Sequence, residues 1–212
     1  MSGLIFLTSS VFAVARSIYE RINMDKPKLA FISTAAEAEE GDLLWLEDSR
    51  NSLVEAGFEV ADYTITGKSR EQIEADLEPF DVLFFSGGNQ FYLLQKVKES
   101  NCAGLIRDFV SAGKVYIGES AGSELAGKDL YSTYHEDDIR KAPDLKNFDG
   151  LSLVDFIVFP HWGSVYFRNK YLGQRMEHAY TENDKIILLT DFQYIIVENG
   201  YYRIIEVEHS SQ

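Results

Sequence analysis

The feature that most constrains the fold is an alternation between short apolar runs and longer amphipathic stretches. The runs, rich in β-branched and aromatic residues, are Leu4–Leu7, Lys28–Ile32, Glu59–Tyr63, Val82–Phe85 and Val115–Ile117. Between them, helical spacing is found in Val11–Ile22, Asp42–Glu55, Ser69–Ala75, Gln90–Glu99 and Gly104–Ala112. Strands that feed crossover helices form a mostly parallel sheet with helices on both faces. The sequence therefore predicts a three-layer α/β fold.

The apolar side chains of the helix expected over Asp42–Glu55 predict which of its faces is buried. Its first turn carries Leu43-Leu44-Trp45-Leu46, and Val54 follows at helical spacing, so these side chains are expected to face the core. Glu47, Asp48 and Arg50 are expected to stay in water.

The pattern changes after Gly127. The stretch Lys128–Leu151 is polar, charged and aromatic, and it is expected to leave the sheet, with Tyr131–Asp144 either walling a pocket as a mobile lid or forming plain solvated surface. Three further strands are expected, at Ile186–Leu189, Tyr194–Val197 and Tyr201–Val207. The last two are joined by Glu198-Asn199-Gly200, a strong hairpin signal. With 45% hydrophobic residues, the 212-residue chain is expected to form a single domain, 1–212.

Charge and composition exclude several classes of function. The formal net charge of -14 argues against nucleic acid or an anionic membrane as a partner. No run approaches the roughly 20 apolar residues of a spanning helix, and the first residues lack the features of a signal peptide. The lone Cys102 suits a reducing compartment, so a cytoplasmic location is expected, with no metal or other cofactor. The sequence leaves a monomer or a homodimer open.

The most informative motif is Gly118-Glu-Ser-Ala-Gly122, which lies between an expected strand and an expected helix. Gly-x-Ser-x-Gly at such a junction fits a nucleophile elbow, where small flanking residues permit the strained turn that lifts a serine hydroxyl above the sheet. Ser120 would then be the nucleophile, and the Ala121 N–H could donate to an oxyanion. The alternative is that Ser120 only caps the following helix.

Two other motifs end expected strands. Gly87-Gly88-Asn89 follows one of them, so the Gly88 N–H is a candidate second oxyanion donor, although an ordinary turn capped by Asn89 is the alternative. Pro160-His161 ends the apolar run that begins at Phe156, which suits His161 as a general base. A purely structural histidine is the alternative there.

Together these segments resemble the family of aspartyl dipeptidases (peptidase E) and cyanophycinases, serine hydrolases on a fold like that of the class I glutamine amidotransferases. The resemblance covers nearly the whole chain, and its marks are Gly87-Gly88-Asn89 with Phe91 and Leu93-Leu94, Gly118–Gly122, and Pro160-His161 followed by Gln174-Arg175. It implies Ser120 as nucleophile, His161 as base, and the N–H groups of Gly88 and Ala121 as the oxyanion hole.

The sequence departs from the family pattern at the acid of the triad. The resemblance places Phe192 where the family usually has a glutamate, so Asp191 is expected to orient His161. The alternatives are Gln193 or an acidic residue elsewhere in the chain. A turn with Thr190 is the plain structural reading of Asp191.

Substrate recognition departs from the pattern as well. Arg175 matches one arginine that the family uses to hold the substrate aspartate, but Leu172 stands at the other, while Arg168 lies one turn earlier. Selection for aspartate is therefore in doubt. Asn89, Glu119 and Arg175 are expected to contact the substrate, with Glu119 pairing with a substrate ammonium or else pointing away.

These features predict a serine peptidase that hydrolyses small peptides through an acyl-enzyme on Ser120. An esterase or deacylase of another small molecule would use the same groups. A third hypothesis, a catalytically silent binding or sensing protein, is motivated by Phe192 at the position of the acid.

Overall fold

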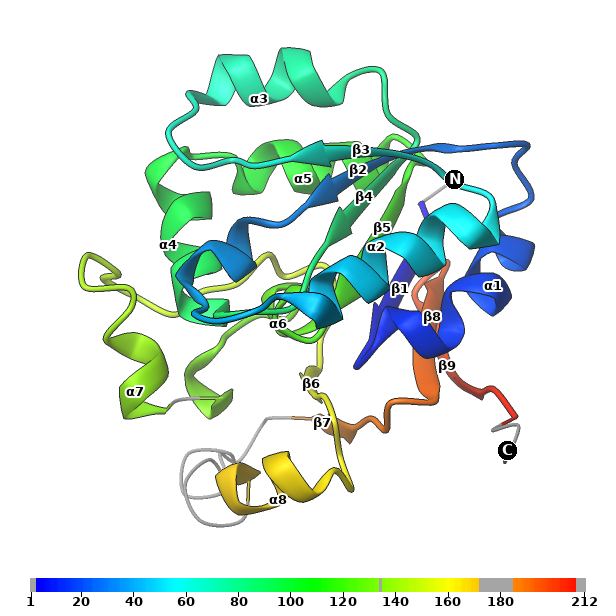
Figure 1. Cartoon of the computed structure of the whole chain (residues 1–212). Helices are drawn as coiled ribbons and strands as arrows, with labels where there is room; N and C mark the ends of the chain where they lie inside the picture. The colour runs from blue at the N-terminus through cyan, green and yellow to red at the C-terminus, as the bar shows by residue number, and fades with distance from the viewer. Residues whose placement is uncertain (1–2, 134, 172–184, 209–212) are drawn as a thin grey trace.

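A computed structural model describes residues 3–133, 135–171 and 185–208 of the chain. In this part of the chain a central sheet contains seven strands in the order β3-β2-β4-β5-β1-β8-β9 (Figure 1). Their bounds are β1 Ile5–Thr8, β2 Lys28–Ile32, β3 Glu59–Tyr63, β4 Val82–Phe85, β5 Val115–Glu119, β8 Gln193–Glu198 and β9 Tyr201–Glu206. The first five are parallel, and the last two add an antiparallel hairpin beside β1. The predicted α/β fold is confirmed.

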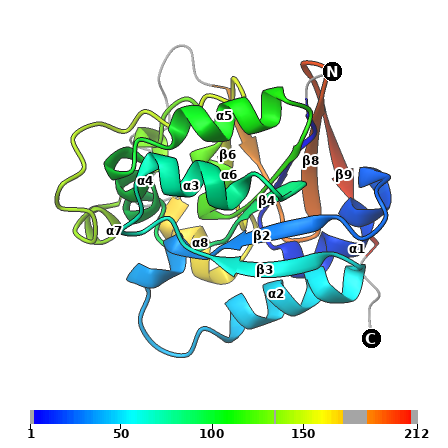
Figure 2. The same ribbon diagram turned by 90° about the horizontal axis from the view of Figure 1, so that it is seen from above.

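Helices cover both faces of this sheet, as Figure 2 shows from above. On one face lie α1 Val11–Ile22 and α2 Leu44–Ala56, and on the other lie α3 Arg70–Leu77, α4 Gln90–Glu99 and α5 Ala103–Ser111. Each face has its own apolar core. In β4, Phe84 stacks on Phe31 at 4.8 Å between ring centroids, while the next residue, Phe85, stacks on Tyr116 at 5.2 Å. Successive strand residues point to opposite faces, so both cores form around this strand.

The segment after Gly127 leaves the main sheet, as expected. It contains two short helical turns, η2 Tyr131–Thr133 and α7 Glu136–Ile139, and then enters a separate two-stranded parallel sheet of β6 Ile157–Phe159 and β7 Ile186–Leu188. The strand expected at Ile186–Leu189 therefore exists but pairs with β6 rather than with the main sheet. The expected hairpin is present too, with Asn199 and Gly200 at φ of 52° and 81°.

The buried face expected for the helix over Asp42–Glu55 is only partly right. Leu46 packs against the core, but Leu44, Trp45 and Val54 are exposed, and the residues of α2 that are buried are Ser49, Leu53 and Ala56. These three recur at helical spacing and include two small side chains, which let α2 pack closely. Apolar character alone did not reveal which stripe of the helix packs.

Two short features complete the described fold. The 3₁₀ turn η1 Thr34–Ala38 follows β2, and α8 Val165–Lys170 follows β6. No helix in residues 3–133, 135–171 or 185–208 has both the length and the apolar character that crossing a bilayer requires.

The contact between β4 and the helix after β5 gives a stability prediction. A methyl group on Gly122 would stand 2.2 Å from the carbonyl oxygen of Phe85, whereas one on Gly104 would meet only the mobile end of Arg70, at 3.4 Å. We expect Gly122→Ala to lower the free energy of unfolding by about 3 kcal/mol, because rigid backbone must shift. Gly104→Ala, in the first turn of α5, should cause no loss. Urea denaturation measures both, and equal stability of the two variants would contradict the packing described.

Candidate active site

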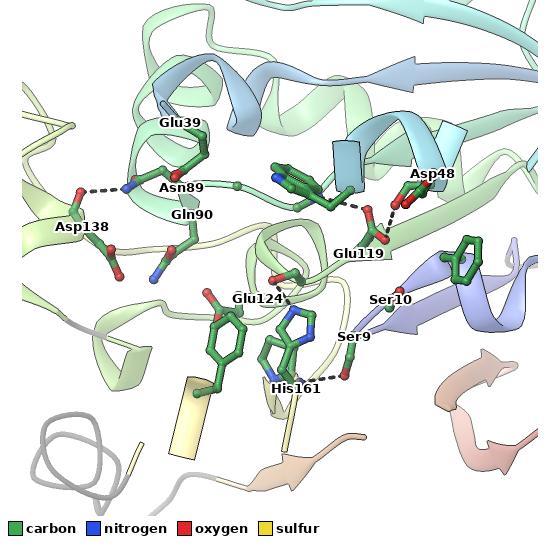
Figure 3. A pocket seen from close by; sticks show the side chains of 18 of the residues that line it. Ser9, Ser10, Glu39, Asp48, Asn89, Gln90, Glu119, Glu124, Asp138 and His161 are labelled. Carbon is green, nitrogen blue, oxygen red and sulfur yellow. Dashed lines mark hydrogen bonds between the residues drawn. The ribbon is translucent and has the colours of Figure 1, made fainter. Parts of the chain in front are cut away.

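The candidate site lies at the carboxyl ends of three neighbouring strands, β4, β5 and β1. Gly87 follows β4, Ser120 follows β5 and Ser9 follows β1, and all three line one pocket of about 740 Å³. In open α/β sheets, ligands bind outside the carboxyl ends of the strands. His161, which follows β6, reaches the same pocket from the small second sheet (Figure 3).

Ser120 occupies a strained turn between β5 and α6 Ala121–Leu125. Its φ and ψ of 47° and -107° lie in a region that residues with side chains seldom adopt, and such strain concentrates at functional sites. The Ser120 N–H donates to the Thr8 carbonyl at 2.9 Å, which ties the turn to β1. The Ser120 side chain makes no capping bond to α6, so its hydroxyl is left for another role.

The glycines on either side make this turn possible. A methyl group on Gly118 would stand 2.5 Å from the Gly122 carbonyl oxygen, and Gly122 itself lies against Phe85 of β4. Any larger residue would push the backbone apart and displace the hydroxyl.

His161 connects the serine to an acid. Its Nε2 lies 3.1 Å from the Ser120 Oγ, and its Nδ1 lies 2.6 Å from the Asp191 Oδ1. An ionised carboxylate can only accept, so Nδ1 carries the proton and Nε2 accepts from the serine hydroxyl. The three residues thus have the arrangement of an acid, a base and a nucleophile.

Two residues that sequence reasoning missed hold His161 in place. The His161 N–H donates to the Ser9 Oγ at 2.9 Å, and that hydroxyl donates to the Leu189 carbonyl at 2.8 Å. Phe167 of α8 stacks on the imidazole at 4.4 Å between centroids, with the ring planes 15° apart. Ser9 could have been found from the sequence, because it lies just after a predicted strand, as the other site motifs do. Nothing in the sequence near Phe167 indicates that it would stack on His161.

The acid beside His161 is Asp191 rather than its neighbours. Gln193 accepts a hydrogen bond from the Thr190 N–H at 3.2 Å, and Phe192 lines a separate hollow beside β9. The Asp191 side chain is 39% exposed. The turn after β7 lies at the surface, so solvent screens part of the attraction between Asp191 and the imidazole.

The loop that carries Gly88 lies beside the serine, and Ala121 follows the serine directly in the chain. Gly88 has φ of 125°, and a methyl group on it would stand 2.4 Å from the Ala35 backbone, so only glycine fits there. A methyl group on the preceding Gly87 would stand 3.4 Å from the Ser120 Cβ, which places this loop directly against Ser120. The N–H groups of Gly88 and Ala121 donate to no acceptor among the described residues.

Asn89 is placed as a structural link, although a substrate contact was expected. Its Oδ1 accepts from the Tyr92 N–H at 2.8 Å and so caps α4, while its Nδ2 donates to the Asp138 carbonyl at 3.0 Å. Asp138 and Lys141 line the pocket, so the segment Tyr131–Asp144 does wall it. Asn89 fastens that wall to the loop of Gly88, and contact with a substrate would require one of these bonds to open.

Glu119, also expected to contact the substrate, is turned toward the protein. Its carboxylate is buried and accepts from the Ser49 hydroxyl and the Val11 N–H, both at 2.8 Å, and from the Gly87 N–H at 3.4 Å. Burial raises the pKa of the Glu119 carboxyl, and the three hydrogen bonds and the nearby His161 only partly offset this. One side chain thereby joins α1, α2 and the loop after β4 beneath the serine.

The remaining expected contact, Arg175, and its neighbour Leu172 lie outside the described residues. Arg168 is exposed on α8. Within the described ranges, no three His, Cys, Asp or Glu side chains gather in a way that would hold a metal ion.

Comparison with known proteins identifies relatives over the whole chain. Residues 2–205 match the model of peptidase family S51. An uncharacterised peptidase of Listeria innocua is 33% identical over 196 residues, 92% of each chain. Peptidase E of Shewanella denitrificans is 32% identical over 118 residues, which are 55% of this chain and 48% of that protein.

Solved structures agree with these sequence matches. The crystal structure of a protein provisionally assigned as peptidase E, from Listeria monocytogenes EGD-e, has a TM-score of 0.88 at 28% identity and covers 98% of this chain and 100% of that one. A peptidase from an acI-B1 actinobacterium shares the fold, with a TM-score of 0.64 at 17% identity over 98% of this chain and 88% of that one.

The raised pKa of Glu119 gives a prediction about pH. A carboxyl group whose pKa is higher in the folded state binds its proton more tightly there, so its contribution to stability is largest below its ordinary pKa and is lost as the pH rises through the folded value. Relative to Glu119→Gln, which cannot titrate, the wild type should lose stability as the pH rises from about 4.5 toward neutrality.

Urea unfolding of both proteins across that pH range measures the difference. Glu47→Gln, an exposed position on α2, is the matched control for the loss of one charge. If the stability of the wild type relative to Glu119→Gln stays constant or rises with pH, the raised pKa of the buried Glu119 carboxyl is contradicted.

Proposed function

Because the chain belongs to peptidase family S51, we propose that it is a serine-type peptidase that hydrolyses small peptides through an acyl-enzyme on Ser120. The observation that carries this proposal is the continuous contact from Asp191 through His161 to Ser120, with distances of 2.6 and 3.1 Å. A serine hydroxyl is a weak nucleophile until a base accepts its proton, and here the base is already in reach and oriented.

The proposed reaction uses each group in turn. The Ser120 Oγ attacks the amide carbonyl carbon while its proton passes to the His161 Nε2, and the carbonyl oxygen becomes an oxyanion facing the N–H groups of Gly88 and Ala121. His161 then gives that proton to the leaving amine, the C–N bond breaks, and an ester to Ser120 remains. Water attacks this ester with His161 again as the base, which releases the carboxylic acid and restores the serine. Asp191 stabilises the imidazolium in both halves.

The size of the pocket favours short substrates. About 740 Å³ falls in the range that holds small molecules and short peptides. One side is walled by Asp138 and Lys141, and this wall is fastened to the sheet by Asn89 and by the pair between Lys141 and Glu39, whose charged atoms lie 3.5 Å apart.

Two alternatives keep the same residues. An esterase or deacylase would use identical acyl-transfer groups on another leaving group. A silent binding homologue was motivated by Phe192, but the short contact of Asp191 with His161 supplies an acid and so favours an active enzyme. A cytoplasmic location and a monomer or homodimer remain predictions from the sequence.

The proposal is tested by steady-state hydrolysis of a dipeptide panel beside a panel of acyl esters. We expect Ser120→Ala and His161→Ala each to lower kcat by about 10⁴-fold or more, because nucleophile and base act as a unit. Asp191→Asn should cost up to about 10⁴-fold, less if water at this half-exposed residue replaces part of its effect. Circular dichroism confirms that each variant is folded.

The outcomes separate the alternatives. Turnover of esters without dipeptides would indicate the esterase, and a folded wild type that turns over neither panel would indicate the silent homologue. Dipeptide hydrolysis that survives in Ser120→Ala would refute the proposed nucleophile.

A further inference from the structure

Two aromatic side chains line the pocket from the first turns of the helices that flank β1 and β2. Phe12 of α1 is 63% exposed and Trp45 of α2 is 39% exposed, and both are among the residues that line the site of Ser120. Neither side chain belongs to the apolar cores formed by the described residues. Large aromatic surface left in water contributes no burial energy to folding, and at a pocket wall it is typical of surface that a ligand covers.

Trp45 lies close to the reacting groups. A methyl group on Gly87 would stand 3.3 Å from the Trp45 Cζ3 and 3.4 Å from the Ser120 Cβ, so the indole edge and the base of the serine side chain are within about 7 Å of one another. Gly87 has no side chain to separate them. A substrate attacked by Ser120 therefore has a residue next to its scissile bond within reach of the indole.

The charges of the described walls argue against an acidic side chain at this place. The described lining residues include a single amino group, that of Lys141, and it is paired with Glu39. They also include the carboxylates of Glu39, Asp48, Glu124 and Asp138, and the carboxyl group of Glu119, which is turned toward the protein. Figure 3 shows these carboxylates distributed around the pocket rather than on one side. A like charge is repelled in such surroundings, whereas an apolar side chain is not.

We propose that Trp45 and Phe12 form a subsite for a bulky apolar side chain, so that the substrates are small peptides with an aromatic or large aliphatic residue next to the scissile bond. This inference rests on the proposed peptidase function and specifies its substrate class. Covering a large apolar side chain corresponds to about tenfold to a hundredfold in affinity. Trp45 is the main contact because its indole lies at Gly87, next to the base of the Ser120 side chain.

Binding to the Ser120→Ala protein tests the subsite without turnover. Isothermal titration calorimetry compares Gly-Gly with Phe-Gly and Gly-Phe, which place the aromatic residue on either side of the peptide bond. At least one phenylalanine dipeptide should bind about tenfold or more tightly than Gly-Gly. Adding Trp45→Ala should abolish that preference, Phe12→Ala should reduce it, and Trp45→Phe should retain part of it.

Leu44→Ala is the matched control. Leu44 lies in the same turn of α2 and is also exposed, but it is not among the described residues that line the pocket. The preference for phenylalanine should survive this change. Equal binding of all three dipeptides, binding of none of them, or equal losses in Trp45→Ala and Leu44→Ala would each overturn the subsite.

The same proteins with Ser120 restored separate this inference from the proposed function. If the Ser120→Ala protein shows no preference for a phenylalanine dipeptide, while the wild type still hydrolyses dipeptides through Ser120, the subsite alone is refuted. A clear preference in Ser120→Ala, together with a wild type that hydrolyses no peptide, would support the subsite and refute the peptidase.

Discussion

The whole site depends on the hydrogen bond between the His161 imidazole and the Ser120 hydroxyl. The two residues come from different sheets, and both have positive φ, 59° for His161 and 47° for Ser120. Such backbone conformations persist only where surrounding contacts over-determine them. For Ser120 those contacts come from Thr8, Gly118 and Gly122, and for His161 they come from Ser9 and Phe167.

The end of β1 contacts both the turn of Ser120 and the backbone of His161. The Thr8 carbonyl accepts from the Ser120 N–H, and the next residue, Ser9, holds the His161 N–H and the Leu189 carbonyl. The small sheet of β6 and β7 is thereby fixed against the large one at the point where the serine turns. Glu119 adds a third connection, because its buried carboxylate holds the loop after β4 that carries Gly88, the proposed oxyanion donor.

The motifs and their resemblance to a known family predicted most of this arrangement. Gly87-Gly88 and Ser120 follow predicted strands of one parallel sheet, and the carboxyl ends of such strands meet at one edge, so their proximity was predictable. His161 follows a strand of the second sheet, and it was assigned to the serine by its motif and by the resemblance. The prediction fails where tertiary contacts decide. The pairing of β7 with β6, the stacking of Phe167 on His161 and the partners of Glu119 join residues far apart in sequence, and nothing local specifies them. The exposure of Trp45 in the first turn of α2 was misjudged because an apolar side chain can line a pocket as well as a core.

The most direct measurement of the central claim is covalent labelling with a fluorophosphonate, read by intact mass and peptide mapping. We expect one label per chain, on the peptide that carries Ser120, formed rapidly in the wild type and very slowly in His161→Ala. A folded protein that takes up no label, or one labelled on another serine such as Ser9, would contradict it.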